Sequence, residues 1–220
     1  MNIDVNGVNL FYEKSGSGSP IILLHGNSED HSIFDVLVPQ LSATHTVYAI
    51  DSRDHGKSDK VSTLEYHAMM EDTAEFIQKL DIQSPALFGF SDGGIIGILL
   101  AAKYPQMLSK LIIAGANTNP NGIKPLTLAA MKAVYFFTRS QQFKMMLTKP
   151  NIPNAELQKI ETPTLVLAGS KDLIREQHTR MIAENIKNST LKILDGEDHT
   201  SYVLHSKKLY GIINPFLTGK

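Results

Sequence analysis

Short apolar runs recur along most of this chain and alternate with longer amphipathic stretches. Six of the runs show no alternation between apolar and polar positions, which is typical of strands covered on both faces. They lie near residues 21–24, 46–50, 86–90, 111–114, 164–168 and 191–194. Strands separated by helices in this way predict an α/β fold, with a mostly parallel sheet and helices on both faces.

The first fifteen residues follow a different pattern. Apolar and polar positions alternate over 3–5 and again over 8–13, on either side of Asn6-Gly7. Asn-Gly favours a two-residue hairpin turn because both residues tolerate positive φ. The N-terminus therefore predicts an antiparallel hairpin at the edge of the sheet, and with it the sheet has eight strands.

Helices are predicted between the strands. Ser62-Thr63-Leu64-Glu65 has the Ser-x-x-Glu spacing of a capping box, which indicates a helix from Ser62 to about Leu80. The remaining helices are expected at about 32–41, 95–104, 175–186 and 201–216. Each follows a strand, as the crossover connections of a parallel sheet require.

Residues 117–154 interrupt this alternation of strands and helices. A turn-rich segment opens the interruption, and helical stretches follow at about 125–138 and 141–147. One face of the first helix is apolar and consists of Leu126, Ala130, Ala133, Val134 and Phe137. The segment is too long for a loop and too short for a domain, so we expect a small helical lid over the strand ends. Residues 1–116 and 155–220 then form the core of a single domain.

The composition narrows the classes of partner. Of the 220 residues, 42% are hydrophobic and 20% are charged, and the formal net charge is −1. This balance predicts a globular protein that binds neither nucleic acid nor an anionic membrane. A small molecule is the expected partner, and a homodimer is left open.

The chain contains no cysteine, which excludes disulfides, thiolate metal sites and a cysteine nucleophile. We expect no metal and no other cofactor. The N-terminus lacks the character of a signal peptide, and no apolar run approaches the roughly 20 residues of a membrane helix. A cytoplasmic protein is therefore expected.

The clearest chemical motif is Gly89-Phe90-Ser91-Asp92-Gly93, between the strand at 86–90 and the following helix. A serine on a sharp strand-to-helix turn needs glycine two positions before and after it, because larger side chains would collide there. Such a turn exposes the Ser91 hydroxyl. It also leaves the backbone N–H of Asp92 at a helix N-terminus, where it can stabilise an oxyanion.

A serine hydroxyl needs a base to take its proton, and the base needs a third group that fixes its tautomer. Among the eight histidines, His199 lies on a loop after a strand and downstream of the serine. Asp172 is the expected acid, because it follows the strand at 164–168 at the edge where ligands bind in α/β sheets. Asp195 and Asp198 are alternative candidates for the acid, because they lie on the loop of His199. Both are so close to His199 in sequence that their carboxylates would not easily reach the imidazole nitrogen that points away from the serine.

A second oxyanion donor is expected from the loop after the strand at 21–24. That loop carries His25-Gly26-Asn27, in which glycine lets the backbone approach a substrate. We expect the backbone N–H groups of Asn27 and Asp92 to form the oxyanion hole together.

These features resemble the α/β-hydrolase fold family over nearly the whole chain. The resemblance implies that residues 25–27 are the oxyanion loop and residues 89–93 the nucleophile elbow, with Asp172 as triad acid and His199 as triad base. Residues 51–58, Asp51-Ser52-Arg53-Asp54-His55-Gly56-Lys57-Ser58, resemble the family's Asp-x-Arg-Gly-x-Gly-x-Ser, with Asp54 where glycine is usual. Aspartate tolerates a positive φ better than most residues. The dehalogenases and epoxide hydrolases of this fold use an Asp nucleophile, so Ser91 excludes them.

Apolar side chains of the elbow and the lid suit an apolar acyl or alcohol group. We expect the substrate pocket to be lined by Phe90, Met131, Phe136, Phe137, Met145 and Met146. Between Thr118 and Ala155 the chain has five Lys and Arg residues and no Asp or Glu. These cations are either a solvated face or a means of attracting anionic substrates.

The site predicts a serine hydrolase that cleaves small carboxylic esters through an acyl-enzyme. One alternative uses the same site for hydrolysis of a C–C bond in a keto acid, or for a lyase step. Another is a ligand-binding protein that has the fold without turnover, because one fold hosts many functions.

Overall fold

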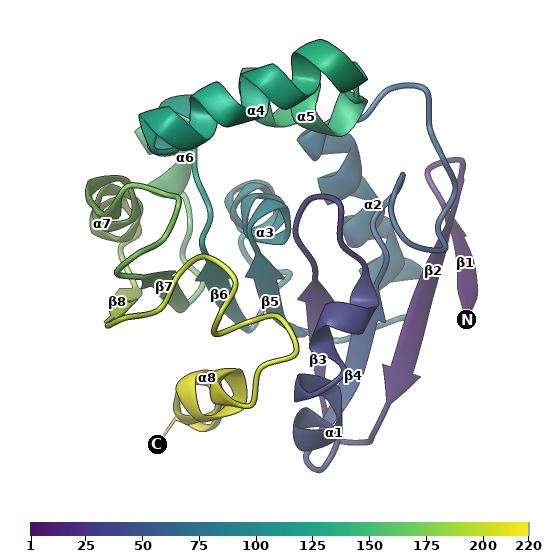
Figure 1. The fold of residues 1–220 in the computed structure, drawn as a ribbon. Coiled ribbons are helices and arrows are strands. Elements are labelled where there is room, and N and C mark those ends of the chain that lie inside the picture. The colour runs from purple at the N-terminus through teal and green to yellow at the C-terminus, as the bar shows by residue number, and fades with distance from the viewer. Residues whose placement is uncertain (220) are drawn as a thin grey trace.

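The computed structural model describes residues 1–219 and contains a sheet of eight strands (Figure 1). The strands are β1 (Asn2–Val5), β2 (Val8–Ser15), β3 (Ser19–Leu24), β4 (His45–Ile50), β5 (Ala86–Phe90), β6 (Lys110–Ala114), β7 (Thr164–Gly169) and β8 (Ser189–Leu194). Their order across the sheet is β1-β2-β4-β3-β5-β6-β7-β8. Pairing is antiparallel where β2 meets β1 and β4, and parallel from β4 to β8. The predicted α/β fold with a mostly parallel eight-stranded sheet is confirmed.

The N-terminal hairpin forms at the predicted turn. Val5 pairs with Val8, and the two residues between them take positive φ, 45° for Asn6 and 76° for Gly7. A turn of this kind matches the right-handed twist of its flanking strands. The hairpin then extends the parallel sheet through the antiparallel pairing of β2 with β4.

Alternate residues of the central strands face opposite layers of helices. In β3, Ile21 and Leu23 pack with η1 (His31–Phe34), α1 (Leu37–Leu41) and α8 (Lys208–Thr218). Ile22 and Leu24 pack with the other layer. That layer consists of α2 (Tyr66–Lys79), α3 (Asp92–Lys103) and α7 (Glu176–Asn185). Both faces of β3 to β7 are largely buried, which is why their sequences are almost continuously apolar, whereas the edge strand β8 alternates between half-buried and exposed residues.

One predicted helix is divided, two begin later than predicted, and α3 begins earlier, at Asp92. The helix expected at 32–41 is divided into η1 and α1, because Pro39 lacks the N–H that an unbroken helix would need at that position. α2 begins at Tyr66, so the predicted capping box does not form, and Glu65 is extended with φ −143° and ψ 135°. The last helix begins at Lys208, after His205 adopts a left-handed φ of 50° that a right-handed helix cannot include.

The lid helices lie over the C-terminal ends of the parallel strands, at the top of Figure 1. α4 (Pro125–Thr138) has the predicted bounds, and α5 (Gln141–Thr148) extends one residue beyond its prediction. The short η2 (Pro120–Gly122) and α6 (Asn154–Leu157) flank them. Within residues 1–219, no helix is long and apolar enough to cross a bilayer.

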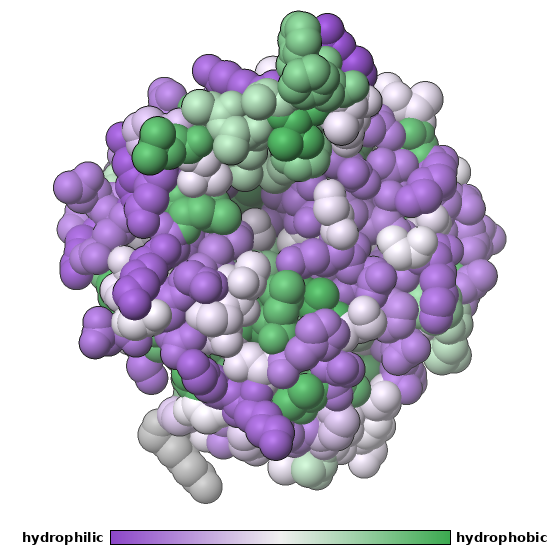
Figure 2. All heavy atoms as spheres, viewed as in Figure 1, coloured by the Kyte–Doolittle hydropathy of each residue, from purple (hydrophilic) through white to green (hydrophobic). Residues whose placement is uncertain are grey.

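The apolar face of α4 that the sequence pattern identifies points away from the core. This face is exposed to solvent, although its member Phe137 was expected in the substrate pocket, and it appears as a band of hydrophobic residues on the lid in Figure 2. Leu128, Met131 and Tyr135 form the inward side and are half-buried. Because both sides of α4 are apolar, the sequence pattern does not determine which one faces the core.

Candidate active site

Ser91 occupies the sharp turn between β5 and α3. Its φ of 51° and ψ of −111° lie outside the regions that residues with a side chain ordinarily adopt. A Cβ atom on Gly93 would lie 2.3 Å from the carbonyl oxygen of Leu24, so the start of α3 can approach β3 only with glycine at this position. The backbone N–H of Gly93 donates to the carbonyl oxygen of His25 at 3.1 Å and thereby ties the elbow to the loop after β3.

His199 lies between Ser91 and Asp172. Its Nε2 is 3.2 Å from Ser91 Oγ, and its Nδ1 is 2.7 Å from Asp172 Oδ1. Asp172 is 1% exposed, and its Oδ1 also accepts the backbone N–H of Ile174 at 2.9 Å. When Nδ1–H donates to this carboxylate, Nε2 is left to accept the hydroxyl proton of Ser91. The geometry is therefore a continuous chain from carboxylate to imidazole to hydroxyl.

Parallel strands explain why these distant residues meet. Ser91 follows β5, Asp172 follows β7 and His199 follows β8, so all three lie at the edge where these strands end. Sequence analysis missed one supporting residue, Gly115, directly after β6. It takes a φ of 64°, and a Cβ atom there would lie 2.7 Å from Cε1 of His199. The imidazole therefore needs a glycine beside it to reach this position.

The two rival acids have other partners. Asp198 Oδ1 accepts the backbone N–H groups of Thr200 and Ser201 at 2.8 and 2.9 Å, and these bonds lower the pKa of Asp198. Asp195 Oδ1 lies 3.5 Å from the hydroxyl of Ser170. Asp198 thus shapes the loop that carries His199, and Asp172 is the carboxylate that contacts the imidazole.

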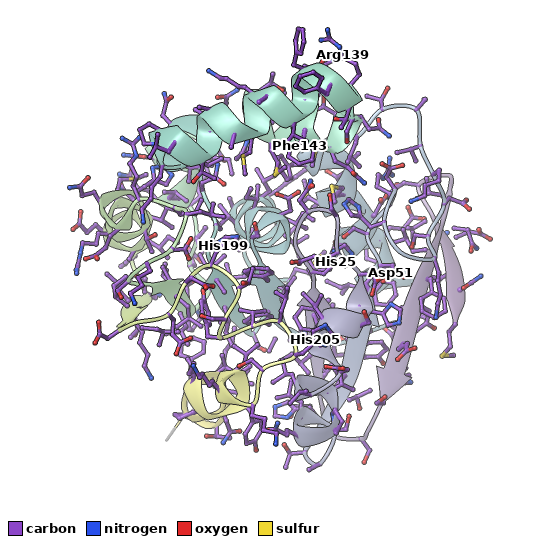
Figure 3. All side chains as sticks on the ribbon, viewed as in Figure 1. His25, Asp51, Arg139, Phe143, His199 and His205 are labelled. Atoms are coloured by element: carbon purple, nitrogen blue, oxygen red, sulfur yellow. The ribbon has the colours of Figure 1, made fainter. Side chains whose placement is uncertain are left out.

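A second histidine, His25, holds the oxyanion loop in place. Its Nε2 accepts the backbone N–H of Ser52 at 3.0 Å, and its Nδ1–H donates to the carbonyl of Gly26 at 2.7 Å. Burial lowers the pKa of His25 to about 4, so the ring is neutral at physiological pH. In the neighbouring loop, Asp54 takes a φ of 68°, which matches the family's usual glycine there. Figure 3 shows His25 beneath the lid, on the Asp51 side of the sheet.

Asn27 and Asp92, the two expected oxyanion donors, both line the cavity that Ser91 lines. Asp92 is the first residue of α3, and the first N–H groups of a helix have no acceptor within that helix. The Asp92 carboxylate accepts the Tyr66 hydroxyl at 2.7 Å and the Asn27 Nδ2–H at 3.0 Å. These bonds hold the buried Asp92 side chain and link it to the oxyanion loop. Burial raises the pKa of the Asp92 carboxyl.

A cavity of about 230 Å³ opens beside Ser91 and His199, beneath the lid. Its walls include Phe90 together with Met131 of α4 and Met146 of α5. Phe136 and Phe137 do not line it, because they lie on the outer side of α4, and Met145 does not because it is buried in the main core. The apolar wall is completed by residues that sequence analysis missed, namely Ile123, Phe143, Leu173 and Ile174.

The charge of the cavity differs from that of the lid surface. No Lys or Arg among residues 1–219 lines it, so the lid cations lie elsewhere. Figure 3 shows this separation, with Phe143 below the lid helices and Arg139 at their outer end. The cavity instead contains the carboxyl groups of Asp92 and Glu29.

Glu29 is the second functional candidate that sequence analysis missed. Its Oε2 accepts the backbone N–H of Gly26 at 2.9 Å, which places the carboxyl beside the oxyanion loop. Burial raises the pKa of Glu29 to about 7, although the Gly26 bond opposes this shift. Glu29 therefore loses its proton near neutral pH, and the cavity gains a negative charge as the pH rises through this value.

One group of side chains has the spacing of a metal site. Asp30, His31 and Asp51 offer ligand atoms within 4.8 Å of one another. Asp51 already accepts the backbone N–H groups of His31 and Lys57 and lies 2.7 Å from His31 Nδ1. The group forms a hydrogen-bonded network that orders the 51–58 loop, and none of its members lines the cavity.

Comparison with known proteins gives the class of this fold. The sequence model of the family described as "alpha/beta hydrolase fold" matches residues 19–144, more than half of the chain. This chain belongs to the α/β-hydrolase fold family. The resemblance drawn from the motifs is confirmed.

Individual relatives include hydrolases and esterases. The chain is 28% identical to the human protein "Serine hydrolase BPHL", over 98% of this chain and 85% of that protein. It is 22% identical to the pimeloyl-acyl-carrier-protein methyl ester esterase of Neisseria meningitidis, over 90% and 93% of the two chains. The solved structure of an esterase from Exiguobacterium antarcticum superposes with a TM-score of 0.85 at 23% identity, covering 97% of each chain.

Proposed function

We propose that this protein is a serine hydrolase that cleaves small, uncharged carboxylic esters through an acyl-enzyme. The observation that carries the proposal is the chain of contacts from Asp172 through His199 to Ser91, at the mouth of an apolar cavity. Hydroxyl, imidazole and carboxylate in this order are the groups that activate a serine nucleophile. The family and the names of the relatives are consistent with such a reaction.

In the proposed first half-reaction, Ser91 Oγ attacks the ester carbonyl carbon while His199 Nε2 takes the hydroxyl proton. The carbonyl oxygen becomes an oxyanion and accepts hydrogen bonds from the backbone N–H groups of Asp92 and Asn27. The C–O bond to the alcohol then breaks, and His199 returns the proton to the leaving oxygen. Asp172 keeps the imidazole in the required tautomer and stabilises its positive charge.

In the second half-reaction, water takes the place of the alcohol. His199 removes a proton from the water as it attacks the acyl carbon, and the acid is released when Ser91 regains its proton. The strained backbone of Ser91 holds Oγ clear of α3 through both steps.

The charge and size of the cavity support small, uncharged esters over the keto-acid alternative. A keto acid carries a carboxylate, and within residues 1–219 the cavity has no Lys or Arg to pair with it. The Glu29 carboxyl, which is ionised above its raised pKa of about 7, would repel such a substrate. A volume of about 230 Å³ is below the roughly 300–1,000 Å³ of sites for drug-sized ligands, which favours short acyl chains.

A substrate panel tests the proposed reaction. We expect p-nitrophenyl acetate and butyrate to be hydrolysed with a kcat/KM at least about tenfold above that of the hexadecanoate, which one cavity of this size cannot enclose. A keto acid of the C–C cleavage type should show no turnover. Release of p-nitrophenol and loss of the keto-acid absorbance provide the two measurements. Turnover of the keto acid in preference to every ester would reject the proposal.

The ionisation of Glu29 predicts a pH-dependent choice between substrates. Its raised pKa of about 7 makes the group neutral below pH 7 and negative above it. We expect the ratio of kcat/KM for p-nitrophenyl hydrogen succinate over p-nitrophenyl butyrate to fall about five- to tenfold as the pH rises from about 6 to 8.5. Using the ratio removes the effect of groups that act on both esters alike, such as His199.

Glu29→Gln should make this ratio independent of pH, because glutamine does not ionise. Glu184→Gln, which changes an exposed residue of α7, is the matched control and should keep the wild-type dependence. A ratio that stays constant with pH in the wild-type protein would show that Glu29 does not control the charge of the site.

A further inference from the structure

The outer side of α4 is an exposed apolar surface. Leu126, Val134, Phe136 and Phe137 are 87%, 40%, 63% and 82% exposed. Within residues 1–219, Met1 is the only other large hydrophobic residue that is exposed to this extent, so the exposure is concentrated on one helix. Ala129, Ala130 and Ala133 are also exposed and fill the space between them. We call these seven residues the outer face of α4, and they appear as the hydrophobic band at the top of Figure 2.

The aromatic end of this outer face carries a cation. The rings of Phe136 and Phe137 pack edge to face, with centroids 5.3 Å apart. The guanidinium carbon of Arg139 lies 5.2 Å from the Phe136 ring centroid. Figure 3 shows Arg139 at the outer end of the lid, directed away from the sheet. Aromatic rings next to basic groups are typical of helices that lie in the boundary between water and lipid.

The segment that carries the outer face has charges of a single sign. Lys124, Lys132, Arg139, Lys144 and Lys149 are exposed, and residues 118–155 contain no Asp or Glu. The lid thus carries a charge of +5 in a chain of net charge −1, which leaves −6 for the rest of the molecule. Within the described residues, Lys149 is the one of the five with a carboxylate partner, Glu65 at 3.9 Å. The net charge of −1, from which the sequence predicted no binding to an anionic membrane, is the sum over the whole chain and does not reveal the positive charge of the lid.

We propose that the outer face of α4 docks the protein on anionic lipid surfaces, with α4 lying along the interface. Exposed apolar side chains would enter the boundary of the acyl chains, while the surrounding cations bind acidic headgroups. A second copy of the chain fits this face poorly, because a symmetric contact would bring two lids of charge +5 together with no carboxylate on either. The inward side of α4 carries Met131 in the cavity wall, so docking would set the cavity close to the lipid.

Vesicle cosedimentation tests the proposal without any substrate, so its outcome is separate from that of the proposed hydrolysis. Wild-type protein should bind vesicles of phosphatidylcholine and phosphatidylserine in equal amounts about tenfold or more tightly than vesicles of phosphatidylcholine alone. Binding to the mixed vesicles should weaken as salt is added. Phe136→Ser with Phe137→Ser should lower the affinity for mixed vesicles about tenfold or more.

Matched variants separate the apolar and the charged contributions. Met1→Ser removes an exposed hydrophobic residue elsewhere and should bind as the wild type does. The lid-charge variant combines Lys124→Gln, Lys132→Gln, Arg139→Gln and Lys144→Gln, and it should lose the preference for phosphatidylserine. The body-charge control combines Lys171→Gln, Lys187→Gln, Lys192→Gln and Lys207→Gln, and it should keep the preference. All these side chains are exposed, and unchanged thermal unfolding will verify that each variant folds.

Three results would overturn the proposal. One is equal binding of the wild type and of the Phe136→Ser, Phe137→Ser variant to mixed vesicles. Another is equal binding of the wild type to both kinds of vesicle. The third is a wild-type protein that does not bind vesicles but self-associates in sedimentation velocity, while the Phe136→Ser, Phe137→Ser variant does not self-associate. That result would assign the outer face to contact with a second copy of the chain.

Discussion

Replacing Ser91 with alanine is expected to lower kcat for p-nitrophenyl butyrate by about 10⁴-fold or more, with little change in KM. Alanine removes the oxygen that forms the acyl-enzyme, while the cavity walls that bind the ester remain. The strained φ of 51° at this position is accommodated by alanine no worse than by serine, so the variant should fold. Steady-state kinetics at pH 8, together with thermal unfolding, provide the measurement.

Ser28 is the matched control for this experiment. It also lines the cavity, but its hydroxyl donates to Asn27 Oδ1 at 2.8 Å and has no contact with His199. Ser28→Ala should keep kcat within about tenfold of the wild type. If Ser91→Ala also keeps kcat within about tenfold of the wild type, the reaction uses another nucleophile.

Replacing Asp172 with asparagine should reduce kcat by about 10³- to 10⁴-fold, the size of effect seen when a triad acid becomes an amide. The amide NH₂ can donate to His199 Nδ1, which moves the imidazole proton to Nε2 and prevents that nitrogen from taking the proton of Ser91. Asparagine has nearly the same shape as aspartate, so the fall in kcat would come from the wrong imidazole tautomer and the missing negative charge. Comparison of kcat between the two proteins over a range of pH measures it.

Asp198→Asn is the control, because Asp198 is the rival acid on the His199 loop. Its carboxylate accepts backbone N–H groups of that loop and makes no contact with the imidazole. We expect at most about a tenfold loss, from a less ordered loop. A larger loss in Asp198→Asn than in Asp172→Asn would reverse the assignment of the acid.

The residues that sequence analysis could place are those fixed by local rules. Continuous apolar runs identified β3 to β7 because both faces of each of these strands are covered. Gly93 is required by the close approach of α3 to Leu24 of β3, and Gly89 by the close approach of the Gly93 backbone, so the elbow is visible as a pattern. Asp172 and His199 followed from the rule that parallel strands end at a common edge.

The residues that it missed depend on contacts between distant segments. Nothing near Glu29 in the sequence indicates a raised pKa, which arises from burial in the folded cavity. Gly115 matters only because His199, from a remote loop, packs against it. The apolar positions of α4 were grouped correctly, but a helix that is apolar on two sides does not reveal which side faces the core.

Active-site labelling tests the central claim most directly. The wild-type protein is treated with a fluorophosphonate probe, and peptide mass spectrometry then locates the adduct. The account predicts one adduct per chain, on Ser91, formed slowly in His199→Ala and absent in Ser91→Ala. A wild-type adduct on another residue, or undiminished labelling of Ser91→Ala, would contradict it.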